Sequence, residues 1–367
     1  MTATAPTQNT ATVKALTNDM IALLRQLIAI PSFSKSEQGT AALIQQTLHQ
    51  RGVTALRVIN NVWARNRYFD KKKPTLLLHS HHDTVKPDKH YTLDPFYPLE
   101  KEGILYGLGS NDAGASLISL MAAFLHFQDQ KDLQYNLIFG AGAEEEISGA
   151  NGIEALLPEI GKIDCAIVGE PTGMKMAVAE KGLLVLDCVA TGRAGHAARE
   201  EGENAIYKAL KDIAWFRDFQ FPKISPLLGP VKMSVTVMEA GTQHNIVPAT
   251  CKFTVDVRVN DCYSHEEVLE LIRQQVDCTV TPRSMRLRAT SIDAGHPLVM
   301  AGRSLGLPDF GSATMSDKAL MPFPALKIGP GDSARSHTAD EYIRLEEIAG
   351  GIETYIRLIG QLLQPAA

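Results

Sequence analysis

The sequence has few aromatic residues, no surplus of basic charge and no long hydrophobic run. Aromatic residues make up 6% of its 367 residues, and the 36 Lys and Arg are outnumbered by 41 Asp and Glu, for a formal net charge of −5. A chain without a basic excess cannot neutralise many phosphates, so nucleic-acid binding is not expected. No apolar run is long enough to cross a bilayer, so no membrane partner is expected either.

Cysteine is also scarce, and no two cysteines form a Cys-x-x-Cys pair. The five are Cys165, Cys188, Cys251, Cys262 and Cys278. Their odd number and wide spacing argue against structural zinc and against a disulfide framework, and they favour reduced thiols in a cytoplasmic protein. Residues 1–12 are small and polar, without a basic start or an apolar run, and are expected to form a frayed terminus rather than a signal peptide.

The first half of the chain alternates helical patterns with short apolar runs. Helices are predicted over residues 13–30 and 40–50. The runs TLLLHS, YNLIFGA and CAIVGE read as strands buried on both faces. This alternation predicts an α/β fold, with a mixed, mostly parallel sheet and helices on both faces.

The pattern changes after about residue 182. Strand, helix, strand, strand, helix and strand follow one another, and the strands alternate strictly, with Met233, Val235 and Val237 expected on one face. This order predicts a smaller ferredoxin-like α+β domain over residues 182–292. It would interrupt a catalytic domain formed by residues 1–181 and 293–367, which ends in a helix from Leu345.

Chemically active residues gather at five places where strands end or helices begin. These places are HSHHD, YGLGSNDAGAS, AEEEISG, IVGEPTG and GPGDSARSHTADE. Each has an ordinary structural explanation when taken alone, such as an acid near a helix start. Open α/β sheets, however, bring the residues beyond their strand ends to one rim, and imidazoles with carboxylates form the ligand set of catalytic zinc.

In their order, these motifs resemble those of the dinuclear-zinc amidohydrolases. That family includes acetylornithine deacetylase, succinyl-diaminopimelate desuccinylase, aminoacylase and glutamate-releasing carboxypeptidase. The similar segments are His81-His82-Asp83, Gly107-Leu108-Gly109-Ser110-Asn111-Asp112, Glu145-Glu146, Gly169-Glu170-Pro171, and Gly329-Pro330-Gly331 with His337. The resemblance runs from about residue 30 to the final helix, and five ordered motifs are specific together although each is weak alone.

The resemblance implies two divalent metal ions, zinc or in its place cobalt, and a role for each ligand. His81 and His337 would each bind one ion, Asp112 would bridge both, and Glu146 and Glu170 would complete the two shells. The Asp112–Ala113 peptide bond is expected to be cis, as the bridging aspartate's bond often is in the family.

Two further acids receive catalytic roles from the resemblance. Asp83 would orient the His81 ring from the same face of an extended segment. Glu145 would be the general base, taking a proton from a metal-bridging water that attacks the amide and passing it to the leaving amine.

The inserted domain is expected to supply residues to the same reaction. His196 resembles a family histidine that reaches the partner subunit's site, which implies a homodimer through this domain. Asn245 matches a position that holds the carbonyl or substrate, and Arg258 is a candidate for pairing with a substrate carboxylate. The family's Asp-x-Lys-Gly reads Asp112-Ala113-Gly114-Ala115 here, which leaves substrate preference open.

The expected activity is removal of an acyl group from an amino acid. N-acetyl-ornithine, in arginine biosynthesis, is the first choice, with acetylcitrulline and succinylornithine close behind. A dipeptidase or carboxypeptidase on the same framework stays open. A mononuclear non-haem iron oxygenase built on His79, His81 and Asp83 is the alternative from another class, and a metal-free binding protein is a third.

Overall fold

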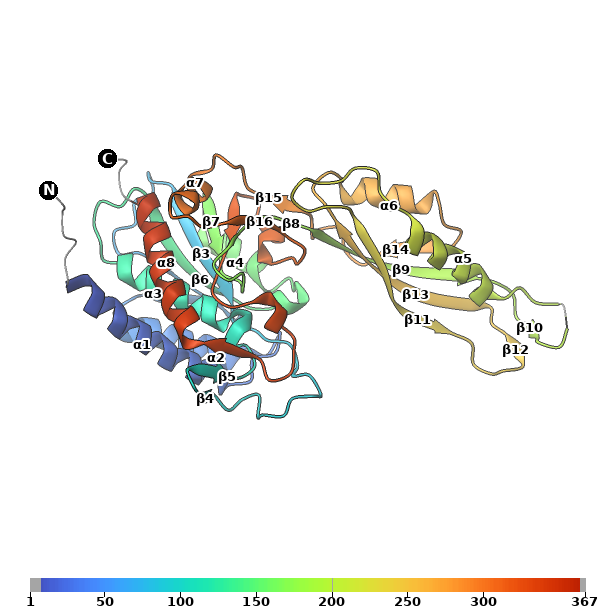
Figure 1. The fold of residues 1–367 in the computed structure, drawn as a ribbon, viewed down its shortest axis with the longest axis horizontal. Coiled ribbons are helices and arrows are strands. Elements are labelled where there is room, and N and C mark those ends of the chain that lie inside the picture. Colours follow the sequence, from blue (N-terminus) through green and yellow to red (C-terminus); the bar gives the residue numbers. More distant parts are fainter. Residues whose placement is uncertain (1–7, 200, 364–367) are drawn as a thin grey trace. The chain divides into compact units, whose positions relative to one another are not determined.

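The computed structural model describes residues 8–199 and 201–363, and the chain divides into two units (Figure 1). The first unit contains Met1–Val178, Ile292–Phe310 and Ser316–Ala367, and the second contains Ala179–Ser291 with Gly311–Met315. The short segment Gly311–Met315 was expected in the catalytic domain. The frayed terminus predicted for residues 1–12 lies outside the described residues as far as residue 7, and from Gln8 the chain is helical, so the prediction was wrong for residues 8–12.

A nine-stranded mixed sheet forms the centre of the first unit, in the order β1-β2-β6-β3-β7-β17-β8-β15, with β16 paired to β8. Its strands are β1 (Ala55–Val58), β2 (Asn61–Arg65), β3 (Thr75–His81), β6 (Asn136–Gly142), β7 (Cys165–Val168), β8 (Met176–Glu180), β15 (Thr290–Ser291), β16 (Asp309–Ser312) and β17 (Ala325–Lys327). The four central strands β6, β3, β7 and β17 are parallel to one another. Pairs toward both edges are antiparallel, so the parallel part is confined to the middle of the sheet.

Helices cover both faces of this sheet, as the sequence predicted. Along β3, Leu76 and Leu78 join the core that contains α1, α2, α3 and α8, whereas Leu77 points to the opposite face and packs with α4. Successive strand residues face opposite sides, so a strand buried on both faces must be apolar throughout. The apolar run in β3 therefore reflects two cores, not one.

The helices of this unit are α1 (Gln8–Ile28), α2 (Gln38–Gln50), α3 (Ala115–Phe127), α4 (Ile153–Ile160), α7 (Pro297–Ser304) and α8 (Leu345–Leu363). Helix α8 begins at the predicted residue. A separate three-stranded sheet pairs β18 (Tyr342–Arg344) with β5 (Ile104–Tyr106) and β5 with β4 (Leu99–Lys101). In the described part of the chain, no helix has the length and apolarity needed to span a membrane.

The second unit has the ferredoxin-like order. Its elements are β9 (Gly182–Thr191), α5 (Ala205–Asp218), β11 (Lys232–Ala240), β13 (Thr250–Val259), α6 (His265–Arg273) and β14 (Thr279–Pro282). The strands form an antiparallel sheet in the order β11-β13-β9-β14, and α5 and α6 pack on it around a core of their own. A two-stranded ribbon, β10 (Gly195–His196) with β12 (Ile246–Val247), extends from this sheet (Figure 1).

For β11, the prediction that Met233, Val235 and Val237 share one face is wrong at Val237. Met233 and Val235 are half-buried against the core, but the side chain of Val237 is 50% exposed. The register of β11 against β13 shifts between Val235 and Val237. An extra residue in a strand reverses the side-chain alternation beyond it, which a strict two-residue period in the sequence cannot reveal.

Candidate metal centre

The four parallel strands end at one edge of the sheet, and each is followed by polar residues. His81 is the last residue of β3, Glu145 and Glu146 follow β6, and Glu170 follows β7. The loop that carries His337 follows β17. Since the carboxyl ends of parallel strands lie side by side, segments that are far apart in the sequence deliver their side chains to one place.

Asp112 reaches the same edge from an irregular turn. Residues Ser110–Gly114 form a wide helical turn just before α3, and within it Asp112 has extended rather than helical backbone angles. The Asp112–Ala113 peptide bond is cis, which confirms the prediction. Gly109 begins the turn with a φ of 75°, a conformation that favours glycine.

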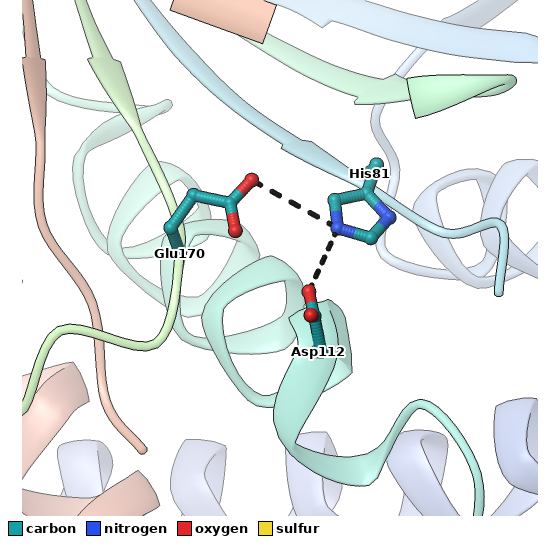
Figure 2. Close-up of side chains that lie close together, drawn as sticks. All are labelled: His81, Asp112 and Glu170. Carbon is teal, nitrogen blue, oxygen red and sulfur yellow. Dashed lines mark hydrogen bonds and ion pairs between the residues drawn. The ribbon is translucent and has the colours of Figure 1, made fainter. Parts of the chain in front are cut away.

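His81, Asp112 and Glu170 form a first group (Figure 2). Nε2 of His81 lies 3.1 Å from Oδ1 of Asp112 and 3.8 Å from Oε1 of Glu170. All three side chains are buried or nearly so, with exposed fractions of 1%, 13% and 12%. One imidazole nitrogen and two carboxylate oxygens thus converge from three elements on one small volume.

Asp112, Glu146 and His337 form a second group. Nε2 of His337 lies 2.9 Å from Oε2 of Glu146 and 3.7 Å from Oδ2 of Asp112. Asp112 therefore directs one carboxylate oxygen toward each histidine. This is the arrangement of a bridging carboxylate between two positions, each of which also has one histidine and one glutamate.

Asp83 holds both His81 and the glutamate turn. Nδ1 of His81 lies 3.0 Å from the carbonyl oxygen of Asp83 and 3.4 Å from its carboxylate, which leaves Nε2 directed at Asp112. The carboxylate of Asp83 also accepts hydrogen bonds from the backbone N–H groups of Glu145 and Glu146, each at 3.1 Å, and from Ser34. Burial works against ionisation, yet the bonds from His81, Ser34 and the backbone lower the pKa of Asp83.

The two groups contain more negative than positive charge. Burial, together with the neighbouring acids Glu170 and Glu146, raises the pKa of Glu145 well above its ordinary value. Burial opposes protonation of His81, but Asp112 and Asp83 still raise its pKa, and the Glu146 carboxylate raises the pKa of His337 to about 9. Protons thus compensate for a surplus of carboxylates that divalent cations would neutralise. The donor set also fits such ions, because mixed nitrogen and oxygen ligands suit catalytic zinc.

The other two histidines of the HSHHD run have structural partners. Nε2 of His79 lies 2.7 Å from Oδ2 of the buried Asp317. His82 is held between the hydroxyl of Thr40 and the carbonyl of Asn60, and burial lowers its pKa to about 4. Since His79 is engaged by Asp317, a triad of His79, His81 and Asp83 is not assembled, which removes the basis of the iron oxygenase alternative.

The predicted residues of the second unit divide into two places. His196 lies in the ribbon and Asn245 directly precedes β12; both are exposed, and the N–H of Ala197 donates to the carbonyl of Asn245. Arg258 lies eight residues beyond Thr250 at the other end of β13, roughly 26 Å away along a strand. There it forms a bidentate pair with Asp256 at 2.8 and 3.0 Å. The structure does not bring Arg258 to the other two residues of the same chain.

Three buried polar residues that support the centre were missed by the sequence analysis. Glu37 accepts hydrogen bonds from the N–H of Glu144 and from Asn60. Asn111 and Glu341 join the Asp112 turn to the segment that carries His337. Both lie inside quoted motifs, but nothing in their spacing marks them, because their contacts join residues more than 200 positions apart.

At one edge of a mixed α/β sheet, two histidines and three carboxylates form the ligand groups of a metallo-hydrolase that acts on amide bonds. The chain belongs to peptidase family M20/M25/M40, whose family model matches residues 77–361. It is 28% identical over 360 residues to a succinyl-diaminopimelate desuccinylase from Corynebacterium glutamicum, with 91% of this chain and 94% of that protein covered.

Solved structures of the family have the same fold. An M20 family metallo-carboxypeptidase from Sulfolobus solfataricus superposes with a TM-score of 0.75 at 17% identity, over 94% of this chain and 98% of that one. A Bacillus subtilis protein described as a dinuclear metal-binding peptidase of family M20 has a TM-score of 0.70 at 18% identity, over 95% and 99%. At these identities the likeness shows the fold, and the ligand set rests on the geometry of this chain.

Proposed function

We propose that the protein is an N-acyl-amino-acid deacylase that uses two divalent metal ions, preferably zinc. The observation that carries the proposal is the pair of ligand groups that share Asp112, with the Glu145 carboxyl on the adjoining turn. His81, Asp112 and Glu170 would hold one ion, and Asp112, Glu146 and His337 the other. Two such ions supply Lewis-acid activation of the amide carbonyl and of the attacking water.

The residues of this chain would handle the proton and the geometry. Glu145 accepts a proton from the attacking water, and its raised pKa suits a group that must later deliver that proton to the leaving amine. The water oxygen becomes bonded to the acyl carbon, the C–N bond breaks, and the amine leaves with the proton. Asp83 keeps His81 in the tautomer that presents Nε2 and aims the Glu145–Glu146 turn.

The proposal also concerns the acyl group and the amino acid that the substrate contains. N-acetyl-ornithine was the first expectation from the sequence, but the likeness to a succinyl-diaminopimelate desuccinylase favours a dicarboxylic acyl group at least as strongly. We therefore propose N-succinyl or N-acetyl derivatives of ornithine, citrulline or diaminopimelate as the substrate class. A dipeptidase or carboxypeptidase is the second candidate, because the metallo-carboxypeptidase of Sulfolobus solfataricus shares the fold.

A substrate panel tests the choice. The zinc-loaded protein is assayed against N-succinyl and N-acetyl derivatives of ornithine, citrulline and diaminopimelate, and against dipeptides with the same side chains. The proposal predicts kcat/KM at least tenfold higher on acyl amino acids, which equals about 1.4 kcal/mol of differential transition-state binding. Faster hydrolysis of the dipeptides would favour the second candidate.

We also propose that two chains pair through the second unit, so that His196 of one chain serves the centre of the other. The edge strand β11 exposes Val237 and Met238, and α5 exposes Tyr207 and Leu210. Apolar surface on an edge strand and an adjoining helix is typical of a self-association face. Asn245 would act beside His196. Arg258 has no such position and stays a weaker candidate.

Five free cysteines, four of them buried, support a cytoplasmic location.

Mixing two inactive variants tests the shared site. His196→Ala and Glu145→Ala are each expected to be inactive, but a mixed dimer contains one centre with both intact residues. Random pairing then restores about a quarter of the wild-type activity. If the mixture stays inactive while light scattering shows dimers, His196 does not act across the interface.

A further inference from the structure

His337 has the most exposed side chain of the five proposed metal ligands. Its side chain is 55% exposed, whereas those of His81, Asp112, Glu146 and Glu170 are between 1% and 13% exposed. Its backbone has a φ of 58°, a conformation that residues other than glycine rarely adopt. Neither packing nor backbone preference therefore fixes this residue, so its position must depend on how the loop around it is tied.

The loop is tied through the side chain of Asn111, which is completely buried. Nδ2 of Asn111 donates to the carbonyl of Asp332 at 3.1 Å, and its Oδ1 accepts from the N–H of Asp332 at 3.0 Å. The same Nδ2 lies 3.4 Å from the hydroxyl of Ser336, the residue before His337. One carboxamide thus satisfies both backbone groups of Asp332, as a neighbouring strand would.

Glu341, which follows His337 in the chain, connects the loop to the Asp112 turn a second time. The carboxylate of Glu341, which is 2% exposed, accepts the N–H groups of Asn111 and Asp112 at 2.9 Å and of Gly109 at 3.0 Å. Asn111 and Glu341 together fasten the turn of Asp112 to the segment between Asp332 and Glu341. We call these two residues the Asn111–Glu341 clamp.

The backbone opposite Asn111 is shaped for this contact. Gly331 has a φ of 92°, and a β-carbon placed there would lie 2.4 Å from Oδ1 of Asn111. Only glycine therefore allows the carboxamide to come close enough for both bonds to Asp332. Asn111 and Gly331 therefore fit each other, and Gly331 lies at the start of the loop that carries His337, a member of the second ligand group only.

We propose that the clamp positions His337 against Asp112 and thereby sets the affinity of the second metal position. Asn111 and Glu341 are positioning residues, since their side chains form hydrogen bonds with backbone groups and with Ser336, and not with the ligand side chains. The first group does not depend on the clamp for His81 and Glu170, which follow the buried strands β3 and β7. The inference rests on the ligand assignment proposed above.

The experiment titrates metal-free protein with Co²⁺ and follows calorimetry and visible absorption. Wild type is expected to bind two ions per chain. Asn111→Leu, which keeps the size but removes both polar atoms, is expected to keep the first ion and to bind the second 10–100-fold more weakly. Its absorption spectrum should match that of His337→Ala. Glu341→Gln, a milder change, should weaken the second ion in the same direction, and it decides the matter if Asn111→Leu does not fold.

Matched controls separate positioning from general stability. Asn136 is buried and makes the same two bonds to the backbone of Asp70, both at 2.8 Å, at the opposite end of β6. Asp212 is a buried carboxylate of the second unit that accepts the N–H groups of Asp277 and Cys278. Asn136→Leu and Asp212→Asn should bind both ions as wild type does, whatever their stability.

Three outcomes would overturn the proposal. Both ions could bind to Asn111→Leu and Glu341→Gln as they do to wild type. Both ions could be weakened equally, or the Asn136→Leu control could lose the second ion to the same extent. A wild-type chain that binds fewer than two ions would instead overturn the ligand assignment itself, and the inference with it.

Discussion

At the residue scale, three histidines within four positions have three different environments. His79 is hydrogen-bonded to Asp317 inside the sheet, His82 is fixed between Thr40 and Asn60, and His81 directs Nε2 at two carboxylates. Residue type and spacing do not separate them. His82 directly follows β3 and faces the side opposite to His79 and His81, and depth along the strand separates His79 from His81.

Substitutions of His79 and His81 should therefore affect different properties, the stability of the fold in the first case and the metal content in the second. His79→Leu leaves the buried Asp317 carboxylate without its imidazole partner, so the free energy of unfolding is expected to fall by about 1–3 kcal/mol. Its metal content should stay at the wild-type value. His81→Ala should lose metal instead. Denaturant unfolding with metal analysis of both variants checks this, and metal loss in His79→Leu would contradict the assignment.

The residue scale also shows where the sequence stops being informative about the site. The five proposed ligands and Glu145 lie in motifs whose order can be recognised, so all of them could be predicted. Asn111, Glu341 and Glu37 could not, because a buried amide or carboxylate that binds distant backbone groups leaves no local pattern. Arg258 was selected for its charge alone, and its pairing with Asp256 is the ordinary fate of an arginine on a strand surface.

At the scale of elements, apolar runs were sufficient to locate the strands that carry the site. Strands β3, β6 and β7 coincide with the three runs that read as buried strands, because burial on both faces demands continuous apolar sequence. The sheet of β4, β5 and β18 was not foreseen. Its strands have three residues each, and they exist only because distant segments pair.

Asp83 connects the end of β3 to the turn that carries the proposed base. Its carboxylate accepts hydrogen bonds from the N–H groups of Glu145 and Glu146, which follow β6. Asp83→Asn has a single acceptor oxygen and places an NH₂ group against one of these donors. We expect kcat to fall 10–100-fold through misplacement of the turn.

Steady-state kinetics on the best substrate of the panel measure the Asp83→Asn effect. Asp164→Asn is the matched control, since Asp164 accepts the N–H of Thr75 at the other end of β3. An Asp83→Asn enzyme with wild-type kcat, or an equal loss in the control, would show that the turn does not depend on this carboxylate.

At the scale of the whole molecule, the two units have separate cores, and the ligands belong only to the first. Metal bound to folded protein stabilises it by about 4 kcal/mol when its concentration is a thousand times the Kd. Removal of metal with a chelator should therefore lower the unfolding temperature of the first unit and abolish activity, and added Zn²⁺ should restore both.

Calorimetry of the full chain checks this, with the transition of the second unit as the internal control. We expect that transition to stay in place, because its core of β-strands, α5 and α6 contains no proposed ligand. A chelator that shifts neither transition, or shifts both equally, would contradict a metal centre confined to the first unit.

The adjacent glutamates Glu145 and Glu146 allow the most direct test, because the first is proposed to be the general base and the second a metal ligand. Zinc content and hydrolysis are measured on the same samples of Glu145→Ala and Glu146→Ala. We predict that Glu145→Ala retains two zinc ions per chain but loses activity by 10²–10⁴-fold, whereas Glu146→Ala loses one ion. Loss of zinc in Glu145→Ala, or wild-type hydrolysis by that variant, would contradict the proposed base and the centre built around it.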